Sequence, residues 1–304
     1  MNQSLGYLAA ILAMVIYALT TILTRLAADR VQSDIGLIVV TTVAVVSSFA
    51  AQLFLVVIGW TLSIFNLSAV LAFSASGFFS AYLGRWLLFE SVVRLGPSRA
   101  SAFLTSVPLF TGFFGWVILE EHLSLNDWLA MATTLVGLLL VSQPNSNQNK
   151  QANFLSVKNW DLSLLGIGLG SSFAYAAGHV CRGYGIRSWN EPLLGVLIGA
   201  VTGLVMQLLT SGDIRTLWGR ILSSNQVGLG IYGAIGLLGM LAQFLAIWAM
   251  LSLPTSKVAL IMTATPLLIF PASWLFLKRF ETINRVTVSG LFLTLLGIVY
   301  LIIY

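Results

Sequence analysis

LGPSRASAFLTSVPLFTGFFGWVILEE, residues Leu95–Glu121, is one of two related stretches in this chain. The other, LPTSKVALIMTATPLLIFPASWLFLKR, covers Leu253–Arg279, and a shift of 158 positions superimposes the two. The shift pairs identical residues or residues of the same charge: Leu95 with Leu253, Ser98 with Ser256, Arg99 with Lys257, Thr105 with Thr263, Pro108 with Pro266, Trp116 with Trp274, and Leu119 with Leu277. The chain therefore contains an internal repeat.

Each copy carries a proline inside an apolar run, Pro108 in the first and Pro266 in the second. Proline has no N–H and clashes with the carbonyl four residues earlier, so the backbone oxygens of Leu104 and Met262 are expected to lose their helical donors. Lipid offers no replacement, so such a break must face protein or a wet cavity. One broken helix in each half is typical of the binding site of a secondary transporter.

The composition indicates an integral membrane protein. Of the 304 residues, 58% are hydrophobic and 8% are charged, whereas soluble domains carry about 25% charged residues. The net charge of +5 needs no nucleic acid partner, because retention of positive loops in the cytoplasm explains it. The N-terminal residues MNQSLG contain no Lys or Arg, unlike a signal peptide, so the first apolar segment is expected to remain as a membrane helix.

The chain predicts an all-α membrane protein with ten transmembrane helices, each of about 20 mainly apolar residues. The expected spans are 6–27, 35–59, 67–91, 97–119, 123–142, 162–184, 192–211, 229–251, 255–277 and 283–303. A polar stretch, Gln143–Asn159, separates five spans from five and reads as a linker. The predicted organisation is a first repeat over 1–143, a linker over 144–160 and a second repeat over 161–304.

The repeat extends beyond the proline stretches. The same shift pairs Tyr17 with Tyr175 and Arg85 with Gln243, and after a small insertion Gly137 pairs with Gly297. Because each half has five spans, the second half must enter the membrane from the opposite side. Two inverted five-helix repeats are typical of secondary transporters.

The duplicated five-span unit with paired prolines resembles the drug/metabolite transporter superfamily, EamA type, over the whole chain. The resemblance implies a ten-helix carrier in the cell inner membrane that alternates access to a central cavity between its halves. It implies a substrate among amino acids, other metabolites, nucleotide sugars or toxic compounds, without choosing one. Tyr17 stands where such proteins often carry a Trp in the first span.

Loop charges predict an orientation opposite to the usual one of bacterial relatives, whose termini are both inside. Loops after odd-numbered spans hold most of the Lys and Arg residues: Arg25, Arg30, Arg94, Arg99, Lys150, Lys158, Arg215, Arg220, Lys278, Arg279 and Arg285. Loops after even-numbered spans hold Arg187 and Lys257, with Arg182 near the end of the sixth span. The positive-inside rule then places the linker in the cytoplasm and both termini outside.

Arg85 is the main candidate for binding substrate, because an ionisable residue inside a membrane span usually faces the interior and has a function. The alternatives are an arginine that extends to the interface or a structural pair with Glu90, five residues away and poorly placed on the same helix. Trp86 and Trp248 are expected to line the cavity, together with Gln243, the repeat partner of Arg85.

Two polar stripes at matching repeat positions are further cavity candidates. Tyr17 and Thr21 lie on one face of the first span, and Tyr175 and His179 lie on one face of the sixth. A histidine packed in a hydrogen-bonded core is the alternative for His179. The other expected substrate-binding positions are Leu104, Thr105, Pro108, Met262, Thr263 and Pro266.

Few residues offer other chemistry. Glu90 and His179 are the candidates for proton coupling, although an interfacial carboxylate is the alternative for Glu90. The single cysteine, Cys181, excludes an internal disulfide, and two histidines in separate halves make a metal site improbable. The chain shows no motif for a catalytic site or a cofactor, so neither is expected.

Glycines at 195, 199 and 203 permit close helix packing, either within the chain or between the subunits of a homodimer. The function predicted is secondary transport, export or exchange, of a small zwitterionic or anionic metabolite such as an amino acid. A broad exporter of apolar compounds remains open, as does an integral membrane enzyme acting on lipid-linked substrates. That enzyme would need clustered acid, base or metal ligands, which the sequence does not display.

Overall fold

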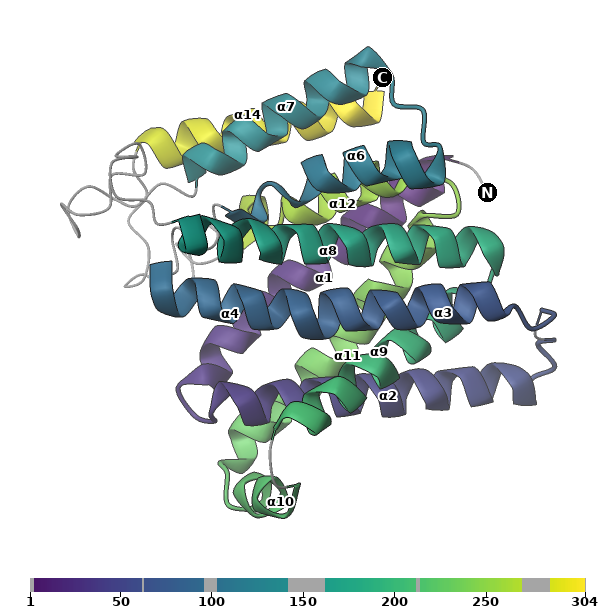
Figure 1. Cartoon of the computed structure of the whole chain (residues 1–304), viewed down its shortest axis with the longest axis vertical. Helices are drawn as coiled ribbons and strands as arrows, with labels where there is room; N and C mark the ends of the chain where they lie inside the picture. Colours follow the sequence, from purple (N-terminus) through teal and green to yellow (C-terminus); the bar gives the residue numbers. More distant parts are fainter. Residues whose placement is uncertain are drawn as a thin grey trace. The chain divides into compact units, whose positions relative to one another are not determined.

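The computed structural model is helical in all of its regular structure over the residues it describes, 3–61, 63–95, 103–141, 162–211, 214–269 and 285–303 (Figure 1). The predicted linker Gln143–Asn159 lies outside the described residues, as do Ser98, Arg99 and Trp274. Each of the ten expected spans contains a helix. The elements in order are α1 (Gln3–Ala28), α2 (Ser33–Val57), α3 (Leu67–Ser76), η1 (Gly77–Leu83), α4 (Gly84–Leu95), α6 (Val107–Leu119), α7 (Leu125–Val141), α8 (Leu162–Ser188), α9 (Pro192–Thr210), α10 (Ile214–Leu222), α11 (Gln226–Ala249), α12 (Thr255–Thr263) and α14 (Arg285–Ile303).

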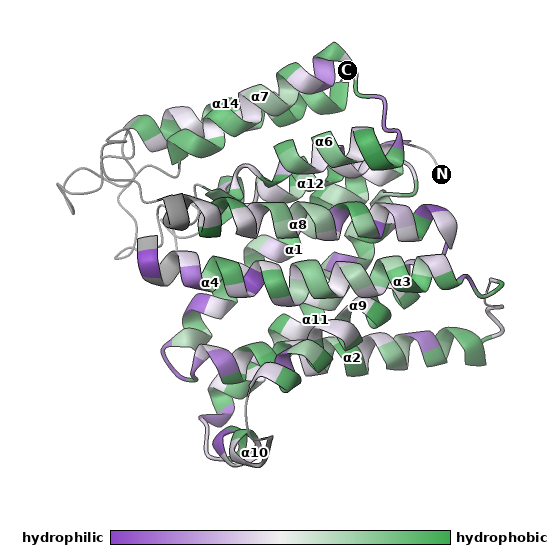
Figure 2. Ribbon diagram, viewed as in Figure 1, coloured by the Kyte–Doolittle hydropathy of each residue, from purple (hydrophilic) through white to green (hydrophobic). Residues whose placement is uncertain are grey.

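Six of these helical segments are long and apolar enough to cross a membrane, namely α1, α2, Leu67–Ser91, α9, α11 and Val286–Ile303. Hydrophobic residues run along most of their length (Figure 2). Three further apolar helices, Val107–Leu119, Leu125–Val141 and Thr255–Ile269, are shorter. The protein is therefore an all-α, multi-pass membrane protein, and the count of ten spans stays a prediction. The short helix α10 between α9 and α11 was not expected.

The chain forms two compact units, and each takes residues from both halves of the sequence. One unit contains residues 1–82 and 181–253, and the other contains 83–180 and 254–304. The first unit holds α1, α2, α3, the end of α8, α9, α10 and α11. The second holds α4, α6, α7, the start of α8, α12 and α14.

In the first unit, α11 packs against both α1 and α2, and α9 packs against α2 and α3. The glycine stripe of α9 faces α3. A Cβ at Gly203 would lie 2.7 Å from the Cβ of Ala81, and a Cβ at Gly195 would lie 2.6 Å from the ring of Phe73. A Cβ at Gly199 would lie 3.6 Å from the backbone oxygen of Phe73. The stripe thus brings two helices of one chain together.

In the second unit, α7 and α14 lie side by side (Figure 1) and run antiparallel. A Cβ at Gly137 of α7 would lie 2.5 Å from the backbone nitrogen of Thr294. A Cβ at Gly297 of α14 would lie 2.7 Å from the backbone nitrogen of Thr134. Because a shift of 160 positions carries Gly137 to Gly297 and Thr134 to Thr294, the two sides of this interface are equivalent. Such an antiparallel, self-matching interface supports the inverted repeat.

Candidate functional site

The helix carrying Pro108 is broken before the proline rather than around it. The turn ends with Ser106, whose backbone N–H and Oγ both donate to the Phe103 oxygen, at 2.9 and 2.7 Å. A new helix, α6, then begins at Val107 with Pro108 in its first turn. Proline is well tolerated there, because the first N–H groups of a helix have no partner inside it. The predicted break is therefore present, and Pro108 lies in the first turn of the helix that follows it.

The repeat-related break has the same form. Helix α12 ends at Thr263, and the Ala264 N–H donates to the Ile261 oxygen at 3.1 Å, as Ser106 does to Phe103. Helical structure resumes at Pro266, so this proline also begins a helix instead of interrupting one.

The expected open carbonyl of Met262 is occupied. The Met262 oxygen accepts from Thr265 Oγ1 at 2.5 Å, and the side chain of Thr263 donates to the Ala259 oxygen at 2.8 Å. Met262 therefore does not present the free acceptor that the sequence suggested, because a threonine inside the turn supplies a donor.

In the first half, several donors bind the backbone oxygen of Phe103. This residue directly precedes Leu104, whose oxygen the sequence suggested as the free acceptor. The Phe103 oxygen accepts from Ser172 Oγ of α8 at 2.6 Å, in addition to the two bonds from Ser106. Thr105 in this turn is buried. The break is thus held by a neighbouring helix, which the pattern of prolines alone could not reveal.

Helix α8 presents one polar face along its length. Gly168 and Ser172 on this face contact Phe103, because the glycine leaves room for the phenylalanine ring. Tyr175 and His179 follow at helical spacing, and both are half-buried. Tyr175 and His179 therefore lie on one face of α8, and their part in a substrate cavity stays a prediction.

Arg85 lies near the start of α4 and is half-buried. The alternative of a structural pair with Glu90 is wrong, because Glu90 Oε1 accepts from Arg94 Nε at 2.6 Å, four residues along. Within the described part of the chain, no carboxylate forms an ion pair with Arg85. Trp86 beside it is 55% exposed, so it lies on the surface of the protein.

The remaining candidates lie in the first unit. Tyr17 is half-buried and Thr21 is exposed, and the Thr21 hydroxyl donates to the Tyr17 oxygen of its own helix at 2.8 Å. Gln243 and Trp248 are half-buried in α11, the helix against which α1 packs. The second unit contains the other candidates: Arg85, Trp86, Glu90, Leu104, Thr105, Pro108, Tyr175, His179, Met262, Thr263 and Pro266.

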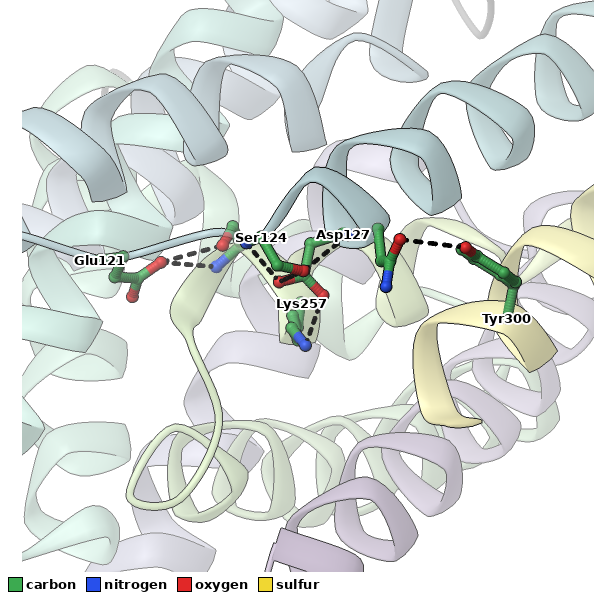
Figure 3. A network of polar contacts seen from close by, with 7 residues as sticks. Glu121, Ser124, Asp127, Lys257 and Tyr300 are labelled. Carbon is green, nitrogen blue, oxygen red and sulfur yellow. Dashed lines mark hydrogen bonds and ion pairs between the residues drawn. The ribbon is translucent and has the colours of Figure 1, made fainter. Parts of the chain in front are cut away.

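A polar network around the connection between α6 and α7 was not anticipated (Figure 3). Glu121 is 4% exposed, and its carboxylate accepts from the Thr255 N–H at 2.6 Å and from Ser256 Oγ at 2.9 Å. These are the first residues of α12, so the negative charge lies at a helix N-terminus, where the helix dipole stabilises it. Glu121 lies just after the expected span 97–119, and nothing in the sequence indicates its burial.

The same network contains a buried ion pair. Asp127 Oδ1 lies 2.5 Å from Lys257 Nζ, with the side chains 6% and 13% exposed. Asp127 also accepts from Ser124 N and Oγ, and its own N–H donates to Ser124 Oγ, which is a reciprocal cap for α7. The sequence S-L-N-D displays this capping pattern, so the cap, unlike the partner Lys257, was detectable.

Among the described residues, no three His, Cys, Asp or Glu side chains gather as a metal-binding group. The candidate residues carry hydroxyls, aromatic rings, an imidazole, an amide and a guanidinium. This chemistry suits hydrogen bonding and charge recognition of a small molecule.

Comparisons with known proteins relate the first half of the chain to one family. The model of the EamA-like transporter family matches residues 4–143, which correspond to the first predicted repeat. No curated protein sequence matches the chain significantly. Among solved structures, 28 chains match, and one of them, a crystal structure of a protein, aligns with a TM-score of 0.69 and 12% identity over 98% of this chain and 96% of its own. That likeness shows that nearly the whole chain shares its fold with a solved protein.

Proposed function

We propose that this chain is a member of the EamA-like transporter family, whose model matches residues 4–143, and that it carries a small anionic or zwitterionic metabolite across the membrane by alternating access. The family is one of membrane transporters of small compounds. The substrate class, the secondary active mechanism and location in the cell inner membrane belong to the proposal.

Arg85 carries the proposal. It lies in Leu67–Ser91, a helix apolar enough to cross a membrane, and Glu90, the nearest acidic residue along that helix, is bound to Arg94. Holding a guanidinium at membrane depth costs about 2.5–3.5 kcal/mol on insertion scales. A substrate carboxylate or phosphate would use this charge, because the guanidinium offers a planar fork of donors that matches both groups.

Tyr175, His179 and Thr105 supply hydrogen-bonding groups in the same unit as Arg85. They would bind the remaining polar atoms of the substrate, including the ammonium group of a zwitterion. Tyr17, Thr21, Gln243 and Trp248, which lie in the first unit, stay predicted substrate-binding residues. Proton coupling through His179 stays part of the proposal, whereas the exposed pair of Glu90 with Arg94 favours the interfacial alternative for Glu90.

Uptake of labelled amino acids and other small acids into proteoliposomes tests the proposal. Arg85→Gln is expected to abolish uptake of the acid that the wild type carries, and Arg85→Lys to restore it only in part. The matched control is Arg94→Gln, on the same helix but paired at the surface, which is expected to keep uptake. Equal uptake by Arg85→Gln and the wild type would refute an acid-binding role.

An exporter of apolar compounds is the second candidate, and an aromatic cluster favours it. Phe173 of α8 makes edge-to-face contacts with Phe110 and Phe114 of α6, with ring centroids 6.2 and 5.0 Å apart. Under this alternative, Phe173→Ala would reduce transport of apolar compounds such as dyes, and Arg85→Gln would leave that transport unchanged.

A further inference from the structure

The helix that carries Arg85 contains seven residues of π-helix, Gly77–Leu83 (η1), between α3 and α4. A π-helix bonds residue i to i+5, so each turn holds one residue more than an α turn. Such segments are rare, mostly short, and frequent at functional sites. The structure shows what holds this one in place.

Helix α8 supplies the first support. Arg182 Nε donates to Ser76 Oγ at 2.8 Å, and Arg182 Nη2 donates to Ser80 Oγ at 2.6 Å. One edge of the planar guanidinium therefore spans two hydroxyls, one immediately before η1 and one inside it. Ser80 Oγ in turn donates to the Ser76 oxygen at 2.7 Å, which satisfies a carbonyl at the entry to the π segment.

Helix α9 supplies the second support. Gln207 is 7% exposed, and its Nε2 donates to the backbone oxygen of Ala81, inside η1, at 3.3 Å. A side-chain donor thus reaches a main-chain carbonyl of the π segment across a helix interface. Gly77, the first residue of η1, lies so close to Gly199 that a Cβ would overlap the Gly199 oxygen and lie 3.0 Å from its Cα. The π segment is therefore fitted to its neighbours on two sides.

We propose that Arg182 is a positioning residue that holds η1 in the π form and so sets the face of the helix on which Arg85 lies. An α-helix turns by about 100° per residue and rises about 1.5 Å, so relaxation of one π turn to α would rotate Arg85 by about 100° relative to Ser76. The inference rests on the proposed role of Arg85 in binding substrate. It gives Arg182 a role that needs no contact with substrate.

The test first removes the hydrogen bonds from Arg182 to Ser76 and Ser80, and then deletes one residue of η1. Arg182→Gln loses the fork across both serines, and uptake by this variant is expected to fall about 10- to 100-fold, as for a misplaced binding group. Deletion of Tyr82 in the same variant shortens η1 by one residue, so that a regular α-helix returns Arg85 to its original face. Uptake is then expected to recover. Arg187→Gln, an exposed arginine on the same helix, is the matched control and keeps uptake.

A second measurement separates the helix geometry from the transport activity. In a Cys181→Ser background, Trp86→Cys reports the helix face next to Arg85 through its rate of reaction with a water-soluble maleimide. Arg182→Gln is expected to change that rate, and the Tyr82 deletion to restore it. Gln207→Leu removes the support from α9 and is expected to change the rate in the same direction, which tests the idea if Arg182→Gln does not fold.

Each outcome decides a different point. An unchanged maleimide rate in both Arg182→Gln and Gln207→Leu would overturn the positioning role. A changed rate with normal uptake would keep the positioning role and refute the proposed function of Arg85. Lost uptake that the deletion does not restore, with an unchanged rate, would mean that Arg182 itself meets the substrate.

Discussion

Gly137 of α7 meets Thr294 of α14 at a distance that leaves no room for a methyl group, 2.5 Å between an added Cβ and the Thr294 nitrogen. Gly137→Ala is therefore expected to destabilise the protein by about 1–3 kcal/mol, the usual range for overpacking. Gly297→Ala, its repeat partner, is expected to cost a similar amount because it meets Thr134 in the same way. Thermal unfolding in detergent measures both.

Gly239 of α11 is the control for these substitutions, because an added Cβ there has nothing within 4 Å. Gly239→Ala is expected to leave the unfolding temperature unchanged or slightly raised, since alanine favours helix. A difference between Gly137→Ala and Gly297→Ala as large as the effect itself would contradict the equivalence of the two sides.

Glu121→Gln is expected to lower stability by about 1–3 kcal/mol, the usual result of leaving a buried hydrogen-bonding group unsatisfied. A glutamine amide would bring a donor toward the N–H groups of Thr255 and Ser256, which need acceptors. Glu120→Gln is the neighbouring control, since Glu120 is exposed. Equal unfolding temperatures for the two variants would show that the Glu121 cap contributes nothing.

Removing one charge of the Asp127–Lys257 ion pair is expected to destabilise the protein more than removing both charges. Asp127→Asn removes the carboxylate that faces the buried ammonium and is expected to cost about 3–5 kcal/mol. The double variant Asp127→Asn, Lys257→Met removes both charges and is expected to recover most of that loss. A double-mutant cycle on unfolding in detergent gives the coupling, and additive effects would argue against a direct pair.

The paired prolines are expected to act alike. Pro108→Ala restores an N–H that can bond to the Leu104 oxygen, which would extend α6 backward through the turn at Thr105. Pro266→Ala would do the same to the turn after Thr263. Both variants are expected to reach the membrane in normal amounts and to transport more slowly. Wild-type uptake rates in both would show that the breaks do not depend on proline.

The charge distribution predicts which loops face the cytoplasm. Asn190 follows the sixth expected span and Ser223 follows the seventh, and both are exposed. In a Cys181→Ser background, Asn190→Cys is expected to react with an impermeant maleimide in intact cells, and Ser223→Cys only after permeabilisation. The reverse pattern would place both termini in the cytoplasm, as in the usual orientation of bacterial relatives.

The sequence predicted most of the helices because hydrophobic runs of about 20 residues have few alternatives in a membrane. It also located both helix breaks, since proline cannot continue a helix without losing a bond. It was wrong about one consequence of these breaks, the free backbone oxygen expected at Met262. Whether Met262 keeps a free oxygen depends on the rotamer of Thr265, which a pattern of residue types does not specify.

Pairings across helices were beyond the reach of the sequence. Glu121 reads as a polar residue at the end of a span, and only the arrival of Thr255 from a distant part of the chain makes it a buried cap. The same holds for Arg182, whose two serine partners lie more than 100 positions away. The π segment gave no signal, because GFFSAYL is equally compatible with an α-helix.

The division of the chain into units has a consequence for biogenesis. Each unit joins segments from both halves, so neither is complete when the first five helices have been synthesised. Synthesis proceeds at about 5–20 residues per second, so α1 and α7 lie in the bilayer for roughly 10–40 s before α11 and α14 exist to pack against them. During that interval Asp127 has no Lys257 and Gly137 has no Thr294. The nascent half-molecule must therefore be sheltered by lipid or by the insertion machinery until translation of its other half is finished.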